Sequence, residues 1–155
     1  MQIGIDGATH LLIARLTAAN FHDAEDTAWA TIWLEACGYT GLTFLSEALN
    51  DEQKSLELRR DALGLDLQNV SCAWLAPGIM RHVEAQGRVF LRNVRHGLFL
   101  LPFTVRHNIG IGCPVDPAFA VGGERHTNPY AEKLTMAEAQ GLTIDDTLWN
   151  MITAH

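Results

Sequence analysis

The sequence predicts an α+β fold in which a helical hairpin and C-terminal helices pack around a small antiparallel β-hairpin or sheet. Two observations predict this class. Helical patterns with capping residues occupy both ends of the chain, and two apolar stretches in the middle, 88–94 and 98–105, have the composition of strands. A length of 155 residues predicts a single domain, 1–155.

The N-terminal third predicts a helical hairpin and a short third helix. Asp6 can cap the first helix, and Asp23 can cap the second. Gly38 is a natural end for the second helix, which carries a seam of large residues at helical spacing: Trp29, Ile32, Trp33 and Cys37. The third helix is expected over 41–49.

The middle of the chain begins with a polar segment, 50–60, which we expect to be an exposed connection. Loose alternation over 63–67 suggests a short edge strand. Pro77 fits the first turn of a helix that ends at Gly87.

The two apolar stretches that follow predict a hairpin. Residues 88–94 alternate, as in a half-buried strand, and residues 98–105 are almost continuously apolar, as in a fully buried one. Gly97 can supply the positive φ that a hairpin turn needs. Pro102 cannot donate to a β-ladder, so the second strand must be an edge there, or bulged, or broken.

After the predicted hairpin, 109–123 is rich in glycine and proline, which predicts a long irregular loop with a role in function or assembly. Asn128 before Pro129 marks the start of a helix, and Gly141 marks its end. Thr143 and Asp146 form a near capping box for a last helix through residue 152.

Charge and cysteine content restrict the function. The formal net charge of −7 disfavours nucleic acid as a partner. Three cysteines without a CxxC pair predict reduced thiols in a cytoplasmic protein. The first residues lack the pattern of a signal peptide, and no apolar run approaches a membrane span, so no membrane partner is expected.

Arginines are concentrated around the middle of the chain, which suits a small anion. Their guanidinium groups can each hold a carboxylate or phosphate with two hydrogen bonds, and nearby glycines free backbone N–H groups. The alternative is that these arginines form internal salt bridges. The candidate anion-binding residues are Arg95, His96, Arg106, Asn108 and Arg125.

The same region offers a candidate catalytic group. Cys113 could act as a nucleophile if His107 held it as a thiolate, with Asp116 nearby. The alternative is a buried, inert thiol. A zinc site through these residues and His126 lacks finger-like spacing, so neither a metal nor a cofactor is expected. His96 and His107 would lie roughly 33 Å apart on an extended strand, so they are not expected to share a site.

Both ends of the chain resemble the type-2 malate/lactate and sulfolactate dehydrogenase family. The resemblance covers 13–45, IARLTAANFHDAEDTAWATIWLEACGYTGLTFL, and 122–152, GGERHTNPYAEKLTMAEAQGLTIDDTLWNMI. Where that family carries its catalytic histidine before Gly-Leu, this chain has Thr40 before Gly41 and Leu42. It also lacks a Gly-rich dinucleotide fingerprint after a strand. The resemblance therefore implies a scaffold without hydride-transfer chemistry. The full chain also looks like a bacterial domain family of unknown function.

Two functions remain after these observations. The first is a non-catalytic, oligomerising domain that forms a homodimer or binds a protein partner and takes up a small anionic metabolite. The alternative is a small cytoplasmic enzyme that uses Cys113 and His107 on a polar substrate. No motif in the sequence is specific enough to name a reaction.

Overall fold

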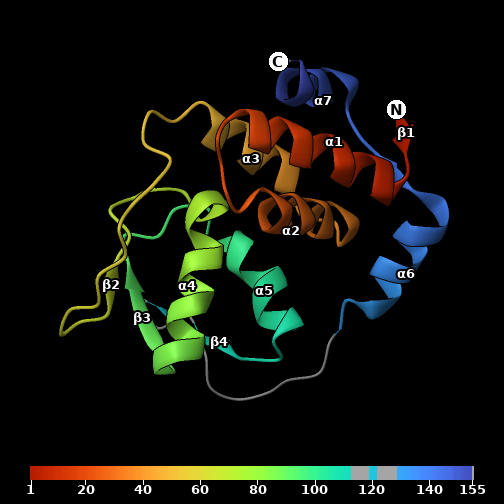
Figure 1. Cartoon of the computed structure of the whole chain (residues 1–155). Helices are drawn as coiled ribbons and strands as arrows, with labels where there is room; N and C mark the ends of the chain where they lie inside the picture. Colours follow the sequence, from red (N-terminus) through yellow and green to blue (C-terminus); the bar gives the residue numbers. More distant parts are fainter. Residues whose placement is uncertain (113–118, 122–128, 155) are drawn as a thin grey trace. The chain divides into compact units, whose positions relative to one another are not determined.

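The computed structural model describes residues 1–112, 119–121 and 129–154, with the backbone alone at 111–112 and 119–121. Helices and short strands are both present, so the predicted α+β class is confirmed (Figure 1). The chain forms two compact units, Met1–Asp51 with Pro129–His155, and Glu52–Asn128. The single domain over 1–155 stays a prediction. Among the described residues, no helix combines the length and the apolar character that a membrane span requires.

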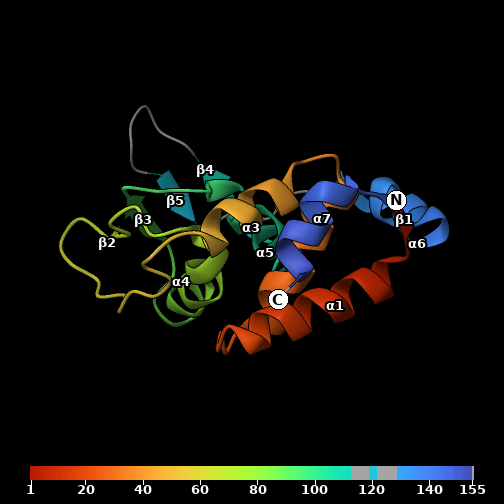
Figure 2. The same cartoon turned by 90° about the horizontal axis from the view of Figure 1, so that it is seen from above.

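The first unit is mainly helical (Figure 2). The helices α1 and α2 pack against each other as the predicted hairpin, and α7 packs against α1 and α3. A two-stranded antiparallel sheet of β1 and β6, which the sequence did not suggest, joins the two ends of the chain. The elements of this unit are β1 (Gln2–Ile3), α1 (Ile5–Ala18), α2 (Ala24–Ala36), α3 (Gly41–Leu49), α6 (Ala131–Gln140), β6 (Leu142–Thr143) and α7 (Asp146–Thr153).

Helices in this unit begin close to the predicted positions, although not every predicted cap residue is at the N-cap position. The helix α2 begins directly after Asp23. The helix α1 begins after Gly4, which places Asp6 in its first turn. The last helix is capped by Asp145, whose Oδ1 accepts a hydrogen bond from the Leu148 N–H at 2.8 Å. The predicted capping box is wrong, because Thr143 lies in β6.

The second unit contains a four-stranded sheet with α4 packed on β3. The strand order is β2-β3-β5-β4, in which β2 and β3 are parallel and the other pairs are antiparallel. Two strands lie inside the predicted irregular loop, so that prediction is wrong in part. The elements are β2 (Leu65–Asp66), α4 (Cys72–Gln86), β3 (Val89–Arg92), the 3-10 helix η1 (Gly97–Phe99), α5 (Leu100–Arg106), β4 (Ile111–Gly112) and β5 (Phe119–Val121).

The predicted strand over 98–105 is wrong, because these residues form η1 and α5. A continuous apolar run does not by itself distinguish a buried strand from a buried helix. Here the most buried side chains recur at helical spacing: Phe99, Leu100, Phe103 and Thr104. Pro102, which cannot donate to a β-ladder, is accommodated early in α5. The antiparallel partner of β3 is β5.

The helix α4 begins five residues before the predicted start at Pro77. Ser71 caps it, and its Oγ accepts a hydrogen bond from the Ala73 N–H at 3.1 Å. Pro77 therefore lies inside the helix, where a proline costs about 3 kcal/mol through a lost hydrogen bond and a steric clash. Burial of nearly the whole segment from Cys72 to Met80 offsets this cost.

Candidate ligand-binding site

The predicted site residues do not form one site. Cys113, Asp116 and Arg125 lie outside the described residues, so nothing tests their roles. The described candidates fall into two groups at opposite ends of α4. His96 contacts Ser71, and His107 faces Glu84. These two positions on the helix are separated by about 20 Å of its axis.

The first group surrounds the start of α4. Nδ1 of His96 lies 2.6 Å from the Oγ of Ser71, and the carbonyl oxygen of Arg95 accepts a hydrogen bond from the Cys72 N–H at 2.9 Å. A serine beside a histidine is the arrangement of a nucleophile and its base. Ser71 is completely buried, however, so a substrate cannot reach its hydroxyl. The contact fixes the start of α4 against the segment before η1.

The second group lies at the end of α5. Nδ1 of His107 is 3.4 Å from a carboxylate oxygen of Glu84. The guanidinium carbon of Arg106 lies 5.0 Å from the ring centroid of Phe103, a cation–π contact. Asn108 has a left-handed backbone with φ 54° and is exposed. These side chains lie at the surface of the unit.

The two described cysteines are poor nucleophiles. Burial raises the pKa of the Cys72 thiol to about 12, although a hydrogen bond with the backbone of Arg95 lowers it. Burial also raises the pKa of Cys37, against the opposing effect of the Lys133 charge. Neither thiol is ionised to a useful extent at neutral pH. The described residues contain no group of three or more His, Cys, Asp or Glu side chains that could hold a metal ion.

A small cavity of about 250 Å³ in the helical unit has two oppositely charged groups in its wall. Glu35 and Lys133 line it, and burial raises the pKa of Glu35. The Oε1 of Glu35 accepts a hydrogen bond from the Leu42 N–H at 2.8 Å, which satisfies a donor at the start of α3. This carboxylate therefore caps α3 in place of Thr40, which occupies the N-cap position but makes no capping hydrogen bond with its side chain.

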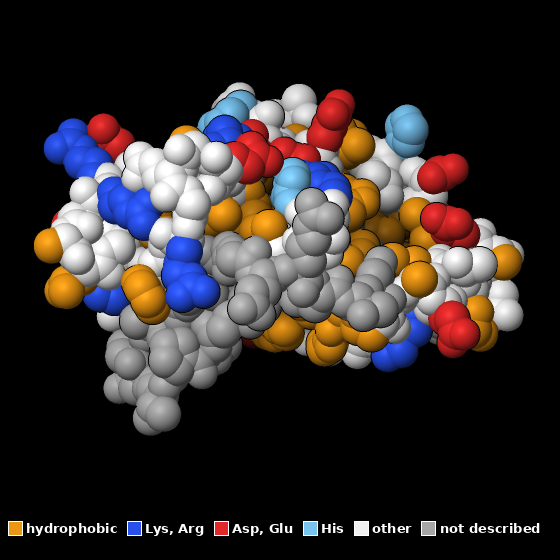
Figure 3. Space-filling view, turned by 90° about the horizontal axis from the view of Figure 1, so that it is seen from below, with side chains coloured by type: hydrophobic (Ala, Val, Ile, Leu, Met, Phe, Trp, Pro, Cys, Tyr) orange, Lys and Arg blue, Asp and Glu red, His pale blue; other side chains and the backbone are white. Residues whose placement is uncertain are grey.

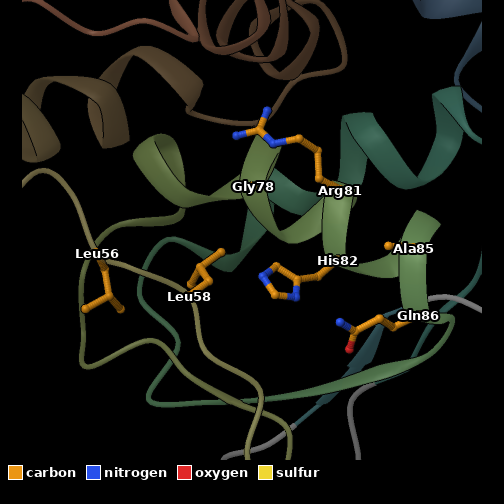
Figure 4. A pocket seen from close by; sticks show the side chains of 7 residues that line it. All are labelled: Leu56, Leu58, Gly78, Arg81, His82, Ala85 and Gln86. Atoms are coloured by element: carbon orange, nitrogen blue, oxygen red, sulfur yellow. The ribbon is translucent and has the colours of Figure 1, made fainter.

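A larger pocket of about 360 Å³ lies in the second unit, between α4 and the extended segment 52–60. Its volume is within the range of small-molecule sites. Leu56 and Leu58 form the wall on the side of the segment, and α4 supplies the other wall (Figure 4). Among the described residues, no acidic side chain lines the pocket. The lining residues are Leu56, Leu58, Gly78, Arg81, His82, Ala85 and Gln86.

His82 projects from α4 into this pocket beside Leu58 (Figure 4). Its Nδ1 is buried and has no hydrogen-bond partner, and no described residue forms a hydrogen bond or an ion pair with the imidazole. Buried polar atoms of native proteins nearly always have a partner, and each exception requires an explanation. A ligand in the pocket would supply a polar partner for the ring.

Gln86 lines one end of the pocket and is hydrogen-bonded to Arg60, which is not itself a lining residue, whereas Arg81 is the lining residue that carries a positive charge. The Oε1 of Gln86 accepts a hydrogen bond from Nη1 of Arg60 at 3.0 Å, and the other guanidinium nitrogen, Nη2, donates to the carbonyl oxygen of Arg88. Neither acceptor carries a full negative charge, and Arg60 forms no ion pair with another residue that the structure describes. The Nε2 of Gln86 makes no hydrogen bond with a described residue.

The second unit, which contains the pocket, has a positive formal net charge. Residues 52–128 contain nine of the eleven basic residues and seven of the eighteen acidic ones, a formal net charge of +2, whereas the other unit carries −9. Figure 3 shows one face of the molecule, on which several Lys and Arg side chains lie close together. Acidic residues near the pocket have basic neighbours, Glu57 with Arg59 and Glu84 with His107.

Comparisons with known proteins add no function. No family model matches the chain, and no curated protein or solved structure matches it. The resemblance of the two ends to the dehydrogenase family therefore stays a prediction. In the structure, the Thr40–Gly41–Leu42 stretch forms the start of α3.

Proposed function

We propose that the protein is a non-catalytic binding protein for a small organic anion, which it holds in the pocket between α4 and the segment 52–60. The observation that carries the proposal is the buried Nδ1 of His82, which has no partner in a pocket without acidic side chains. The predicted ligand class is kept. In this proposal the residues that the sequence suggested are replaced by His82 and Gln86, which line the pocket, and by Arg60, which is hydrogen-bonded to Gln86.

The balance of electrostatic effects favours an anion at the Gln86 end of the pocket. A hydrogen bond to a charged group contributes about 1.5–3 kcal/mol. The C-terminal end of α4 repels an anion by about 0.3–1 kcal/mol, because the helix dipole is negative there. The interaction with Arg60 is therefore larger than the repulsion, and the free donor of Gln86 adds to it.

Calorimetric titration of the full chain tests the proposal, with butyrate as the anion and butyramide as its uncharged analogue. We expect butyrate to bind and butyramide to bind at least about tenfold more weakly, from the loss of the charged interaction. Arg60→Gln should weaken butyrate binding by a similar factor. Arg59→Gln is the matched control, because Arg59 is exposed and pairs with Glu57. The proposal would be contradicted if Arg60→Gln and Arg59→Gln bound butyrate with equal affinity, or if the wild type bound no anion.

Self-association is the second part of the proposed function. Its support is the exposure of two large apolar side chains in the second unit, Leu63 at 66% and Phe90 at 45%. Phe90 points away from the core, because Val89 and Leu91 on either side of it are buried. Sedimentation of the wild type and of the double variant Leu63→Ser, Phe90→Ser tests this. A wild type that stays monomeric at every concentration rejects self-association.

A small enzyme acting through Cys113 and His107 is the alternative. The observation in its favour is the position of Glu84, 3.4 Å from Nδ1 of His107, where a carboxylate can orient an imidazole base. Alkylation of the native protein at neutral pH tests this alternative, because an activated Cys113 should react faster than a free thiol. A Cys113 that resists alkylation rejects the nucleophile.

A further inference from the structure

We infer that the cavity between α2 and α6 in the helical unit binds a small amino acid, with its ammonium group at Glu35 and its carboxylate at Lys133. The site is separate from the proposed anion pocket, which lies in the other unit. The inference follows from the two charged groups in the wall of the cavity, from the helix end that lines it and from its size.

Glu35 presents a carboxylate to the cavity without a cation beside it. One of its oxygens, Oε1, accepts the hydrogen bond from the Leu42 N–H at 2.8 Å. The other oxygen, Oε2, can accept hydrogen bonds as well, and it forms neither a hydrogen bond nor an ion pair with a described residue. Burial raises the pKa of Glu35, because a partly buried carboxylate without a cation is poorly solvated. An ammonium group in the cavity would supply the positive charge that this carboxylate lacks.

Lys133 lies in the wall of the same cavity and does not pair with Glu35. Its Nζ donates to the carbonyl oxygen of Cys37 at 3.4 Å and forms no ion pair with any residue that the structure describes. A lysine ammonium group has three N–H donors, so donors remain for a ligand. Opposite charges that line one cavity without pairing with each other match a ligand that carries both charges. A zwitterion is such a ligand.

The end of α6 favours a positive group in the cavity. Gln140, the last residue of α6, and Gly141, its C-cap, both line the cavity. The last turn of α6 contains no basic residue, so no side chain of this turn balances the negative end of the helix dipole. The helical unit contains eleven acidic and two basic residues, a formal net charge of −9. These charges favour a ligand with an ammonium group over a simple carboxylate.

The size of the cavity restricts the ligand. Its volume of about 250 Å³ is below the range of about 300–1,000 Å³ that is usual for sites of drug-sized molecules. Apolar side chains form much of the rest of its wall, which suits the methylene groups of a short chain. These side chains are Ala36, Met136, Ala137 and Leu142.

Calorimetric titration of the full chain with glycine, β-alanine and γ-aminobutyrate tests the inference. These amino acids differ by one methylene group each, so the series measures the span between Glu35 and Lys133. We expect one member to bind best. Its amide, which lacks the carboxylate, and its N-acetyl derivative, which lacks the ammonium group, should each bind to this cavity at least about tenfold more weakly.

Glu35→Gln should lower the affinity for the best amino acid at least about tenfold, because it removes the charge that holds the ammonium group. The variant should stay folded, since glutamine still accepts the hydrogen bond from the Leu42 N–H. Glu138→Gln is the matched control, because Glu138 is an exposed acid of α6 outside the cavity. Lys133→Gln should also lower the affinity, whereas Lys133→Arg, which keeps the charge, should lower it less.

Binding at the anion pocket is distinguished by its dependence on Arg60. If the amino acid loses affinity in Arg60→Gln and keeps it in Glu35→Gln, it binds at the anion pocket and the inference is overturned. The inference is also overturned if no amino acid of the series binds, or if Glu35→Gln and Glu138→Gln bind the best one with equal affinity. None of these outcomes affects the proposed function, which is tested with butyrate.

Discussion

The hydroxyl of Ser71 lies 2.6 Å from Nδ1 of His96, and the serine is completely buried. The same oxygen accepts a hydrogen bond from the Ala73 N–H. His96 has a left-handed backbone with φ 56°, as do Gln68, Asn69 and Asn93 close to the same helix start. The pair therefore fixes two strained turns against α4, and its role is structural.

Ser71→Ala should lower the free energy of unfolding by about 1–3 kcal/mol, because it removes a helix cap and the hydrogen bond between Ser71 and the His96 ring. Urea denaturation measures this loss. Ser55→Ala is the matched control, since Ser55 is exposed and its side chain makes no hydrogen bond with a described residue. An unchanged stability of Ser71→Ala would show that the contact does not hold α4.

Glu35 should make stability depend on pH. Burial raises its pKa above the ordinary 4.5, so the folded state disfavours the carboxylate relative to the unfolded state. The resulting penalty is absent below the ordinary pKa and appears as the pH rises through the raised value. Glu35→Gln keeps an acceptor for the Leu42 N–H and lacks the charge. Its gain in stability over the wild type should be largest at neutral pH and disappear in acid.

Glu35→Ala separates the hydrogen bond from the charge. It leaves the Leu42 N–H without its acceptor, which should cost about 0.5–2 kcal/mol, the range measured for helix caps. Urea denaturation of both variants at neutral pH gives the comparison. Equal stability of the Gln and Ala variants would remove the capping role that we assign to this carboxylate.

Asp66 should titrate below its ordinary range. A hydrogen bond from the Asn93 side chain lowers the pKa of Asp66 most, and the Gln68 N–H lowers it further. Asn93→Ala should raise this pKa toward the ordinary value, as followed by NMR of the side-chain carboxyl carbon. Because the folded pKa is depressed, the contribution of Asp66 to stability is present at neutral pH and lost in acid. A pKa that is the same in both proteins would contradict this assignment.

Gly41→Ala should destabilise the helical unit. A Cβ at this position would lie 2.6 Å from the Thr31 carbonyl oxygen and 2.8 Å from Cβ of Leu34, so α2 and α3 would have to move apart. Overpacking of this kind costs about 1–3 kcal/mol. Gly4→Ala is the control, because nothing lies within 4 Å of its added Cβ. Thermal unfolding should separate the two variants clearly.

Local patterns predicted the helices well and failed where contacts distant in sequence decide the structure. The helix α2 follows from Asp23, two acidic residues in its first turn and Gly38 at its end. The run 98–105 has strand composition but forms η1 and α5. The position beside β3, where this run would pair as a strand, is occupied by β5, about 30 residues after β3 in the sequence. The cap at Ser71 gives a weaker sequence signal than Pro77, which is typical of the first turn of a helix.

The pocket could not be predicted from sequence for a related reason. The segment 50–60 is the most polar part of the chain, a pattern that predicts an exposed connection. Leu56 and Leu58 alternate with exposed residues there and are half-buried. This period-two pattern was the available signal. His82, 24 residues after Leu58, gives no sign of its buried nitrogen, because that property depends on the tertiary structure.

The most direct test of the anion site is the long-range ¹H–¹⁵N spectrum of the histidine rings, recorded with and without butyrate. The account predicts that the ring nitrogens of His82 shift in proportion to the bound fraction, whereas those of His22, whose side chain is 82% exposed, do not. The shift should disappear with butyramide. A His82 signal that does not respond at saturating butyrate, or that moves no more than the signal of His22, would contradict the account.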